Sequence, residues 1–511
     1  MLVIAMVVSN IGMWMQMVGA QWLLIDEPGA TRLIALIQTA MTLPTALFAV
    51  PAGIIADNVD RRRMLIVVQA AQLSVAALLT TLVLSHHIAP YPLLGLLFVL
   101  GAGTALSLVP FQASLVELVP REQMPIAASM TGLSANIARA IGPALAGVLV
   151  ASFGTGLVFV LNVICVAIYL AAILKWRSAP KPRAAEPEPF RAAFVAGVRY
   201  VRHSPHIRRL LSRVIVFTVP AQAIWALLPL VAKRQLGLDV GAYGTLLAAI
   251  GVGAIFAVIA IPRMRELWQT NGTIAFSMFA YALSLLGLSF SSTLAQAVPL
   301  LVVIGFGWIG TLSTITGSLQ LYLPGWVRSR GASMNTLVLF GGQAIGAAVW
   351  GTFADHMTLQ QTYWIAAGVI VCGSLYGWLR PLSDVEQLDR TPANYWPEVA
   401  PAIDPTEGSG TVLVVIEYRI PPEYVDEFVD GIAYVRITRL RTGGYNWQLQ
   451  RDVENPERFV ETYESPSWDE HMRQHDARLT ESDRAYEARV NALSRVKPDV
   501  QHFIRNAVKK L

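Results

Sequence analysis

Apolar stretches long enough to cross a bilayer recur along most of this 511-residue chain. A helix needs about 20 apolar residues to span the hydrocarbon core of a membrane. Twelve stretches qualify: 2–25, 31–56, 64–85, 91–116, 124–152, 155–175, 207–232, 241–262, 271–290, 294–322, 331–354 and 358–380. Only 14% of the residues are charged, whereas soluble domains carry about 25%. The sequence therefore predicts an all-α membrane protein with twelve transmembrane helices.

The first stretch, 2–25, lies where a secretory signal would lie. It has no basic leader and no small-residue cleavage site, and Asn10, Trp14 and Gln16 interrupt its apolar character. We therefore expect a retained spanning helix. Because the chain starts inside this helix, we also expect that a cytoplasmic leader is missing from the sequence.

Lysine and arginine collect in alternate loops. With the N-terminus inside, the inner loops hold Arg61, Arg62, Arg63, Arg121, Arg263, Arg265, Arg328 and Arg330. The outer loops hold only Arg32, Lys233 and Arg234. Cytoplasmic loops are the ones that accumulate these residues, so both termini are predicted to face the cytoplasm.

The spans fall into two groups of six, residues 1–175 and 207–380, with a long loop over 176–206. The loop begins with a proline-rich spacer. Phe190, Phe194, Val198 and Val201 then recur at helical spacing among arginines. This pattern predicts a short basic amphipathic helix on the inner leaflet.

An internal repeat supports the division into halves. When the sequence is shifted by 204 residues, Gly142 falls on Gly346 and Gly147 falls on Gly351. The triplet Ala-Ser-Met at 128–130 recurs in the same register. The fifth and eleventh spans are therefore predicted to be equivalent elements of the two halves.

Polar side chains within the spans face a cavity or a neighbouring helix. The candidates for a substrate pathway are Asn10, Trp14, Gln16, Gln112, Asn136, Arg139, Gln222, Trp225 and Gln343, with Gln38, Gln320 and Asn335 as further polar positions. For each amide taken singly, a helix-to-helix hydrogen bond is an equal alternative. For the two tryptophans the alternative is anchoring at the membrane interface.

Arg139 is the one formal charge near the middle of a span. An arginine at that depth costs at least about 2.5–3.5 kcal/mol, so it needs a partner. Carbonyls freed by Pro143, helped by Asn136, are one candidate; an anionic cargo is the other. No acid lies at a comparable depth, so coupling to a proton or another ion would have to use Asp26, Glu27, His86 or His87, or another route.

The segment Gly53-x-x-x-Asp57-x-x-x-Arg61-Arg62-Arg63 resembles the loop signature of the major facilitator superfamily. Asn58 stands where an arginine is usual, and Asp60 stands where a glycine is usual. The resemblance implies a gate in which Asp57, Arg61 and Arg62, with Glu117 as partner acid, latch the outward-facing state. Topology anchoring is the alternative for the arginines.

The fifth span contains ANIARAIGPALAG, which resembles the Gly-Pro antiporter signature of exporters through Gly142, Pro143 and Gly147. Longer segments, such as PAGIIADNVDRRR and SWDEHMRQHDARLTESDR, resemble the enterobactin-exporter-like transmembrane secretion effector branch. This resemblance implies an efflux pump in a bacterial inner membrane that exports a siderophore-like, drug-like or other amphipathic or anionic molecule.

A linker over 381–410 precedes a soluble domain at 411–511. Its predicted β-α-β-β-α-β order matches the ferredoxin-like plan and resembles the antibiotic-biosynthesis-monooxygenase type. His471 and His475 have a zinc-binding spacing, but no third ligand lies nearby in sequence, so no metal site is predicted. We expect no cofactor and no nucleic-acid partner, and self-association through this domain stays open.

No phosphate-binding loop of the Gly-x-x-x-x-Gly-Lys-Ser/Thr type occurs in the chain, which argues against direct use of ATP. The sequence therefore favours a secondary transporter, not an enzyme. The alternative is an enzyme or sensor in which the C-terminal domain carries the activity and the membrane part only anchors it.

Overall fold

The computed structural model describes residues 2–118, 124–176, 190–382, 388–393, 395–396, 402 and 410–504. The chain divides into two compact units. The first comprises residues 1–184, 211–317 and 333–382; the second comprises 185–210, 318–332 and 383–511.

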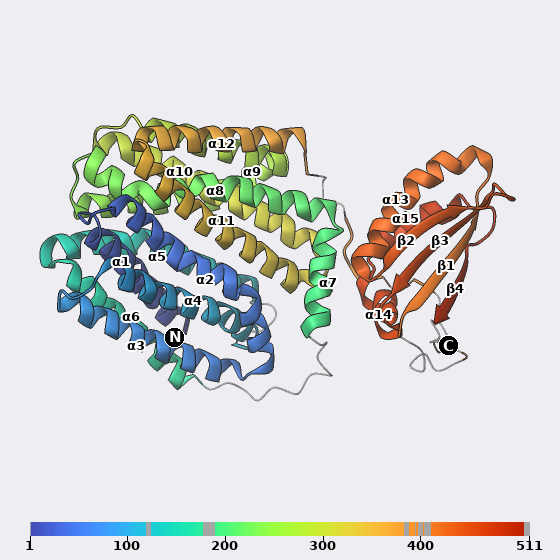
Figure 1. Ribbon diagram of the computed structural model, residues 1–511, viewed down its shortest axis with the longest axis horizontal. Coiled ribbons are helices and arrows are strands. Elements are labelled where there is room, and N and C mark those ends of the chain that lie inside the picture. Colours follow the sequence, from blue (N-terminus) through green and yellow to red (C-terminus); the bar gives the residue numbers. More distant parts are fainter. Residues whose placement is uncertain are drawn as a thin grey trace, which may run out of the picture. The chain divides into compact units, whose positions relative to one another are not determined.

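The first unit is a bundle of long helices (Figure 1). Its helices are α1 (Leu2–Leu23), α2 (Ala30–Asn58), α3 (Arg61–Leu84), α4 (Pro90–Leu118), α5 (Met124–Phe153), α6 (Thr155–Lys175), α8 (Pro205–Leu230) with the π-helical turn η2 (Val231–Gln235), α9 (Val240–Leu288), α10 (Leu294–Tyr322), α11 (Arg328–His356) and α12 (Leu359–Leu379). One end of each of α8, α10 and α11 is assigned to the second unit. The backbone polar groups of a spanning segment must be paired internally, which a helix achieves. Ten helices within the described residues are long and apolar enough to cross a membrane.

Two predicted spans, 241–262 and 271–290, form the single long helix α9. Its 49 residues are interrupted at Gln269, whose φ of 55° and ψ of −178° are not helical. The helix α5 also differs from the other spans, because its described apolar part runs only from Ile137 to Phe153. The mostly helical membrane fold is thus as predicted.

Small residues let α5 pack closely on two neighbours. A Cβ atom added to Gly142 would lie 2.6 Å from the Cβ atom of Trp14 on α1. One added to Gly147 would lie 2.8 Å from the carbonyl oxygen of Val240 on α9. Glycines at such spacing allow helix backbones to approach each other within a membrane. The helix α5 therefore joins the N-terminal group of spans to the C-terminal one.

The repeat-related glycines of α11 make equivalent contacts. A Cβ atom added to Gly346 would lie 2.4 Å from the carbonyl oxygen of Val219 on α8. One added to Gly351 would lie 2.3 Å from the Cβ atom of Ala35 on α2. The helix α11 thus packs on the first helix of its own half and on a helix of the other half, as α5 does.

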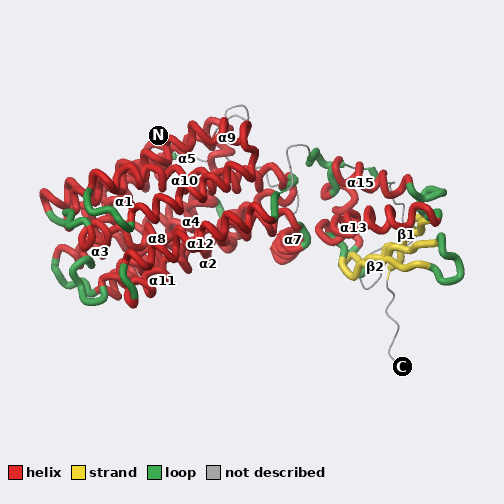
Figure 2. Tube along the Cα trace, turned by 90° about the horizontal axis from the view of Figure 1, so that it is seen from above, coloured by secondary structure: helices red, strands yellow, loops and turns green. Residues whose placement is uncertain are grey.

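The second unit contains a four-stranded antiparallel sheet with helices on one face (Figure 2). Its elements are α7 (Phe190–Arg202), η3 (Gly325–Val327), β1 (Val412–Arg419), η5 (Pro422–Tyr424), α13 (Val425–Thr442), β2 (Tyr445–Arg451), β3 (Arg458–Ser465), α14 (Trp468–Arg473), η6 (Gln474–Arg478), α15 (Glu481–Ala492) and β4 (Asp499–Ile504). The strand order is β2-β3-β1-β4. The central strand β1 buries alternate residues, as a sheet covered on one face should.

The helical region that follows β3 is divided into separate helices and is not one long helix. The helix α14 passes into the π-helical turn η6 and stops, and α15 begins afresh after Thr480. Thr480 and Asp483 form a reciprocal capping box, which supplies partners for the first backbone N–H groups of α15. This capping box therefore starts α15 as a separate helix.

Part of the predicted linker packs on the sheet domain. Pro392 forms a β-bridge with Thr480, and the backbone N–H of Ala393 donates to the carbonyl of Leu479 at 3.0 Å. The indole N–H of Trp396 donates to Glu487 at 3.3 Å. These described positions therefore belong to the domain.

The amphipathic helix α7 belongs to the same unit as the sheet domain. Arg199 of α7 forms a 2.6 Å ion pair with Glu470 of α14. Tyr200 is 1% exposed, and the guanidinium of Arg441 on α13 lies 5.8 Å from the centre of its ring. Two side chains of α7, Arg199 and Tyr200, therefore contact the C-terminal domain.

Candidate functional site

Three of the predicted pathway residues meet in the first unit. The guanidinium carbon of Arg139 on α5 lies 5.6 Å from the ring centre of Trp14 on α1 and 5.6 Å from that of Trp225 on α8. The two indole rings are themselves 6.0 Å apart. The charge thus lies between two aromatic faces, one from each half of the bundle.

The rings account for part of the compensation that Arg139 needs. A cation–π contact contributes about 0.5 to 2 kcal/mol, with the larger values where water is excluded. Two such contacts can offset an insertion cost of about 2.5–3.5 kcal/mol. A ring face does not accept the in-plane N–H bonds, however, and the buried Nε of Arg139 has no acceptor within the described residues.

Aromatic side chains continue from this group into the C-terminal half. Trp308 of α10 lies 5.7 Å from Trp225, and Phe217 of α8 lies 5.7 Å from Trp308, measured between ring centres. Gln222, one turn from Trp225, is 1% exposed, and its Oε1 has no donor among the residues that the structure describes. The surface beside Arg139 is therefore aromatic with one buried amide.

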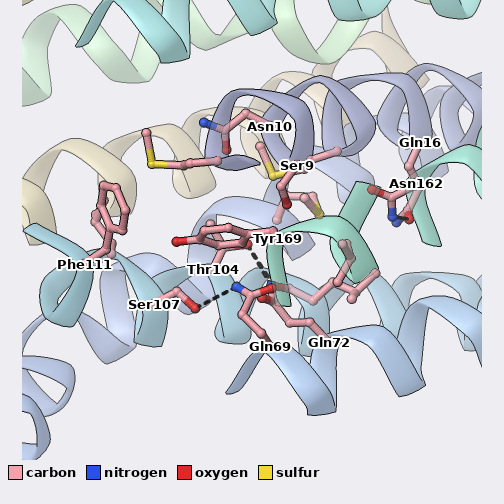
Figure 3. Close-up of a pocket in the computed structure, with 16 residues that line it drawn as sticks. Ser9, Asn10, Gln16, Gln69, Gln72, Thr104, Ser107, Phe111, Asn162 and Tyr169 are labelled. Atoms are coloured by element: carbon pink, nitrogen blue, oxygen red, sulfur yellow. Dashed lines mark hydrogen bonds between the residues drawn. The ribbon is translucent and has the colours of Figure 1, made fainter. Parts of the chain in front are cut away.

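A cavity of about 250 Å³ lies in the N-terminal half (Figure 3). Asn10 and Gln16 of α1, both predicted pathway residues, line it. The rest of the lining is Met6, Ser9, Met13, Met41, Gln69, Gln72, Leu100, Thr104, Ser107, Leu108, Phe111, Asn162, Val166 and Tyr169. Amides, hydroxyls and methionines thus share this wall, a mixture that suits an amphipathic molecule.

Several amides of the lining are paired between helices. Gln69 of α3 donates to Ser107 of α4 at 3.2 Å, and Asn162 of α6 donates to Gln16 of α1 (Figure 3). Hydrogen bonds between helices are the predicted alternative to substrate contact for each amide. For Gln16 the structure brings both roles together, since the residue lines the cavity and binds α6.

The predicted gate is described only in part. The side chains of Asp57 and Glu117 lie outside the described residues, as do those of Gln112 and Asn136. The guanidinium of Arg62 donates a 2.7 Å hydrogen bond to the carbonyl of Leu174, in the last turn of α6. An arginine there pairs with a carbonyl at the negative end of the helix.

The profile of the transmembrane secretion effector family matches residues 1–510. The chain belongs to this family. Among curated proteins it is 22% identical to the staphyloferrin A transporter of Staphylococcus aureus over 370 residues, which is 71% of this chain and 91% of that protein. It is 25% identical to the enterobactin exporter of Salmonella typhi over 361 residues, or 66% and 81% of the two chains.

Two solved transporters share the fold. A mutant of the nucleoside transporter NupG superposes with a TM-score of 0.61 at 12% identity, over 74% of this chain and 99% of that one. A bacterial homologue of the lysosomal transporter Spinster superposes with a TM-score of 0.54, also at 12% identity, over 73% and 94%. The family match and the curated relatives confirm the predicted superfamily membership: this secretion effector is a bacterial multi-pass membrane transporter, not an enzyme.

In this secretion effector the two halves also meet where α1 ends and α9 begins. The hydroxyl of Tyr243 donates a 2.6 Å hydrogen bond to Gln21, and both side chains are buried. On the same side of the bundle, the ammonium group of Lys233 lies 3.6 Å from the carboxylate of Asp26. Asp26 is one of the residues predicted as candidates for ion coupling. The antiporter-signature glycine Gly147 lies against Val240 at the start of α9. Of the other predicted residues, Gln343 lies half-buried on α11.

One further group of candidate side chains was not predicted as a group from the sequence. His471, His475 and His502 lie together in the C-terminal domain, with one ring nitrogen from each within 4.8 Å of the others. The sequence shows the first two at a zinc-binding spacing but no third ligand nearby. His502 is 27 positions further along the chain, and only the pairing of β4 with β1 brings it near.

Proposed function

We propose that this transporter exports a small amphipathic anion from the cytoplasm across the bacterial inner membrane, by alternating access. The observation that carries the proposal is Arg139 between Trp14 and Trp225. Flat rings suit the aromatic or apolar part of a cargo, and the guanidinium fork suits a carboxylate or catecholate. The relatives named as exporters of staphyloferrin A and enterobactin support a siderophore-like cargo.

The experiment is uptake into everted membrane vesicles across a panel of planar anions and neutral amphipathic compounds. Arg139→Lys keeps the charge but loses the planar fork, so we expect uptake of planar anions to fall about tenfold while neutral compounds are unaffected. Arg139→Gln should abolish anion uptake. An uncoupler added to wild-type vesicles tests the proton gradient as the energy source.

Arg32→Gln is the matched control, since Arg32 is exposed at the start of α2. It should transport the whole panel at the wild-type rate. Anion uptake at the wild-type rate in both Arg139 variants would mean that Arg139 is structural, and the anionic cargo would be rejected.

We further infer twelve spanning helices, with α5 as one of them and α9 counted as two across Gln269. Both termini and the C-terminal domain then face the cytoplasm, as the distribution of arginines favours. A cysteine placed at the exposed Val453 should not react with an impermeant maleimide in intact cells. It should react once the cells are permeabilised. Reaction in intact cells would reverse the orientation.

The C-terminal domain is, on this proposal, a ferredoxin-like module that assists transport. Its strand order, β2-β3-β1-β4, supports that plan. Asp57, Arg61, Arg62 and Glu117 would close the cytoplasmic side, and the contact between Gln21 and Tyr243 would close the opposite side. The two sets of contacts should form alternately, so that only one side of the transporter is open at a time.

A further inference from the structure

The C-terminal domain holds three histidines whose ring nitrogens converge. His471 is on α14, His475 is in the π-helical turn η6, and His502 is on the edge strand β4. The ring centres of His471 and His475 are 5.0 Å apart, and those of His471 and His502 are 4.9 Å apart. One ligand atom from each lies within 4.8 Å of the other two.

The fold explains why His502 points toward the helices. In the antiparallel pairing it lies opposite Val414 of β1, and residues directly opposite each other share a face of the sheet. Val414 is 1% exposed on the helix-covered face. The helical segment that follows β3 supplies the other two histidines from above that face, so three separate elements build the group.

Two of these rings, those of His471 and His502, have ring nitrogens without a hydrogen-bond partner among the described residues. His471 is fully buried, yet neither of its ring nitrogens has a partner within the described residues, nor does Nε2 of His502. Leaving one buried polar group unsatisfied costs about 1–3 kcal/mol. One ion could bind one nitrogen of His471 together with Nε2 of His502, and so supply a partner to an unpaired atom of each ring.

The charge state of the rings suits that ligand. Burial, with the neighbouring histidines and Arg439, lowers the pKa of His471 to about 3 and that of His475 to about 4. Both rings are therefore neutral at pH 7, and a neutral imidazole is the form that binds metals. Asp476 and Glu487 also place negative charge near His475.

We propose that His471, His475 and His502 bind one divalent transition-metal ion, with Zn²⁺ as the ion expected. Three imidazoles with no thiolate suit Zn²⁺, Co²⁺, Ni²⁺ or Cu²⁺ and disfavour Ca²⁺ and Mg²⁺, which take oxygen ligands. Zn–N bonds of about 2.0–2.1 Å require the three nitrogens to move closer, which side-chain rotation can supply.

Three protein ligands leave a tetrahedral ion one open position. His502 is only half-buried, so the ion can enter from that side. Trp396 and Trp468 border the site, with ring centres 4.5 Å from His475 and 5.7 Å from His471, respectively. These indoles pack against the imidazoles.

The test uses the full chain, purified in detergent with a tag that contains no histidine and stripped with a chelator. Titration with Co²⁺ should give one equivalent and the visible absorption of a four- or five-coordinate ion, which Zn²⁺ then displaces. Zn²⁺ should raise the midpoint of thermal unfolding of the C-terminal domain, because a ligand that binds only the folded state stabilises it.

His475→Gln and His502→Gln should each weaken binding more than 100-fold and remove the thermal shift. The double variant His86→Gln, His87→Gln is the matched control, since this exposed pair lies between α3 and α4; it should bind as the wild type does. His502→Gln that keeps one equivalent with unchanged spectrum would overturn the proposal, as would wild-type binding no tighter than millimolar.

Discussion

At the scale of single residues, the hydrogen bond between Tyr243 and Gln21 is the plainest link between the halves. It is 2.6 Å long, and the Nε2 of Gln21 has no acceptor within the described residues. Removing the hydroxyl would leave a second buried atom of Gln21 unpaired, at a cost of about 1–3 kcal/mol. The cost falls only on the conformation in which α1 and α9 touch.

Tyr243→Phe should therefore shift the transporter about tenfold toward the conformation open on that side. Asp57→Asn should shift it in the opposite direction, because it weakens the proposed cytoplasmic closure. Both shifts are measured as the alkylation rate of a cysteine at the buried Ala20, in a background that lacks Cys165 and Cys372.

The control for this pair is Tyr363→Phe. Tyr363 of α12 is fully buried, but its hydroxyl has no partner within the described part of the chain. Removing it should leave the alkylation rate unchanged. If all three variants react alike, the contact between Tyr243 and Gln21 takes no part in closure.

At the scale of elements, the contact between α5 and α9 depends on the absence of side chains. Besides Gly147, Gly244 allows close approach, since a Cβ atom added there would lie 2.6 Å from the carbonyl oxygen of Pro143. Backbone atoms at that distance cannot yield by a side-chain rotation. The two helices must therefore move apart if a methyl group is added.

Gly147→Ala should lower the transport rate at least tenfold without lowering the amount of protein in the membrane. Gly95→Ala on α4 is the control, because no atom lies within 4 Å of its added Cβ, and alanine there should favour the helix by about 0.5–1 kcal/mol. Transport is measured in everted vesicles. Equal activity of the two variants would show that α5 and α9 separate without cost.

Hydropathy predicted the membrane helices well, because lipid imposes one solution on every spanning segment. The predicted span 155–175 coincides with α6, and 358–380 differs from α12 by one residue at each end. No comparable local pattern in the sequence predicts which distant segments pair with each other. The approach of His502 to His471 follows from strand register, and the ion pairs of Arg439 with Glu461 and Glu487 follow from helix-on-sheet packing.

The candidate site could likewise be predicted in part. Arg139 was identified because a charge in a span is rare, and both tryptophans because they lie far from the helix ends. That the rings would bracket the guanidinium could not be predicted, since it depends on the rotation of α1, α5 and α8 about their own axes. The role of Gln16 in binding Asn162 depends on the same rotations.

At the scale of the whole molecule, Glu470 links the loop between the halves to the C-terminal domain. Its carboxylate binds Arg199 at 2.6 Å and Arg478 at 2.6 Å. Burial alone would raise the pKa of Glu470, but these hydrogen bonds outweigh it and lower the pKa below its usual 4.5. The link is therefore complete at neutral pH and is lost as the pH falls through the lowered value.

A spin label on the exposed Arg202 at the end of α7 should report this loss. Its mobility should be low at pH 7 and should rise only when the pH falls through the lowered pKa of Glu470, which lies below 4.5. Glu470→Gln should be mobile at every pH, whereas Glu423→Gln, at an exposed position, should follow the wild type. A pH-independent signal in the wild type would contradict the link.

The make-up of the second unit has a consequence for any attempt to shorten the chain. Residues 185–210 and 318–332 belong to this unit together with the segment that starts at 383, so no single cut releases it whole. Truncation after residue 382 would take Glu470 from Arg199 and Arg441 from the ring of Tyr200. In the remaining chain, the side chains of α7 that pack on the C-terminal domain would be exposed. A shortened transporter that fails to work would therefore reveal a damaged part of the transporter itself, and not merely a missing appendage.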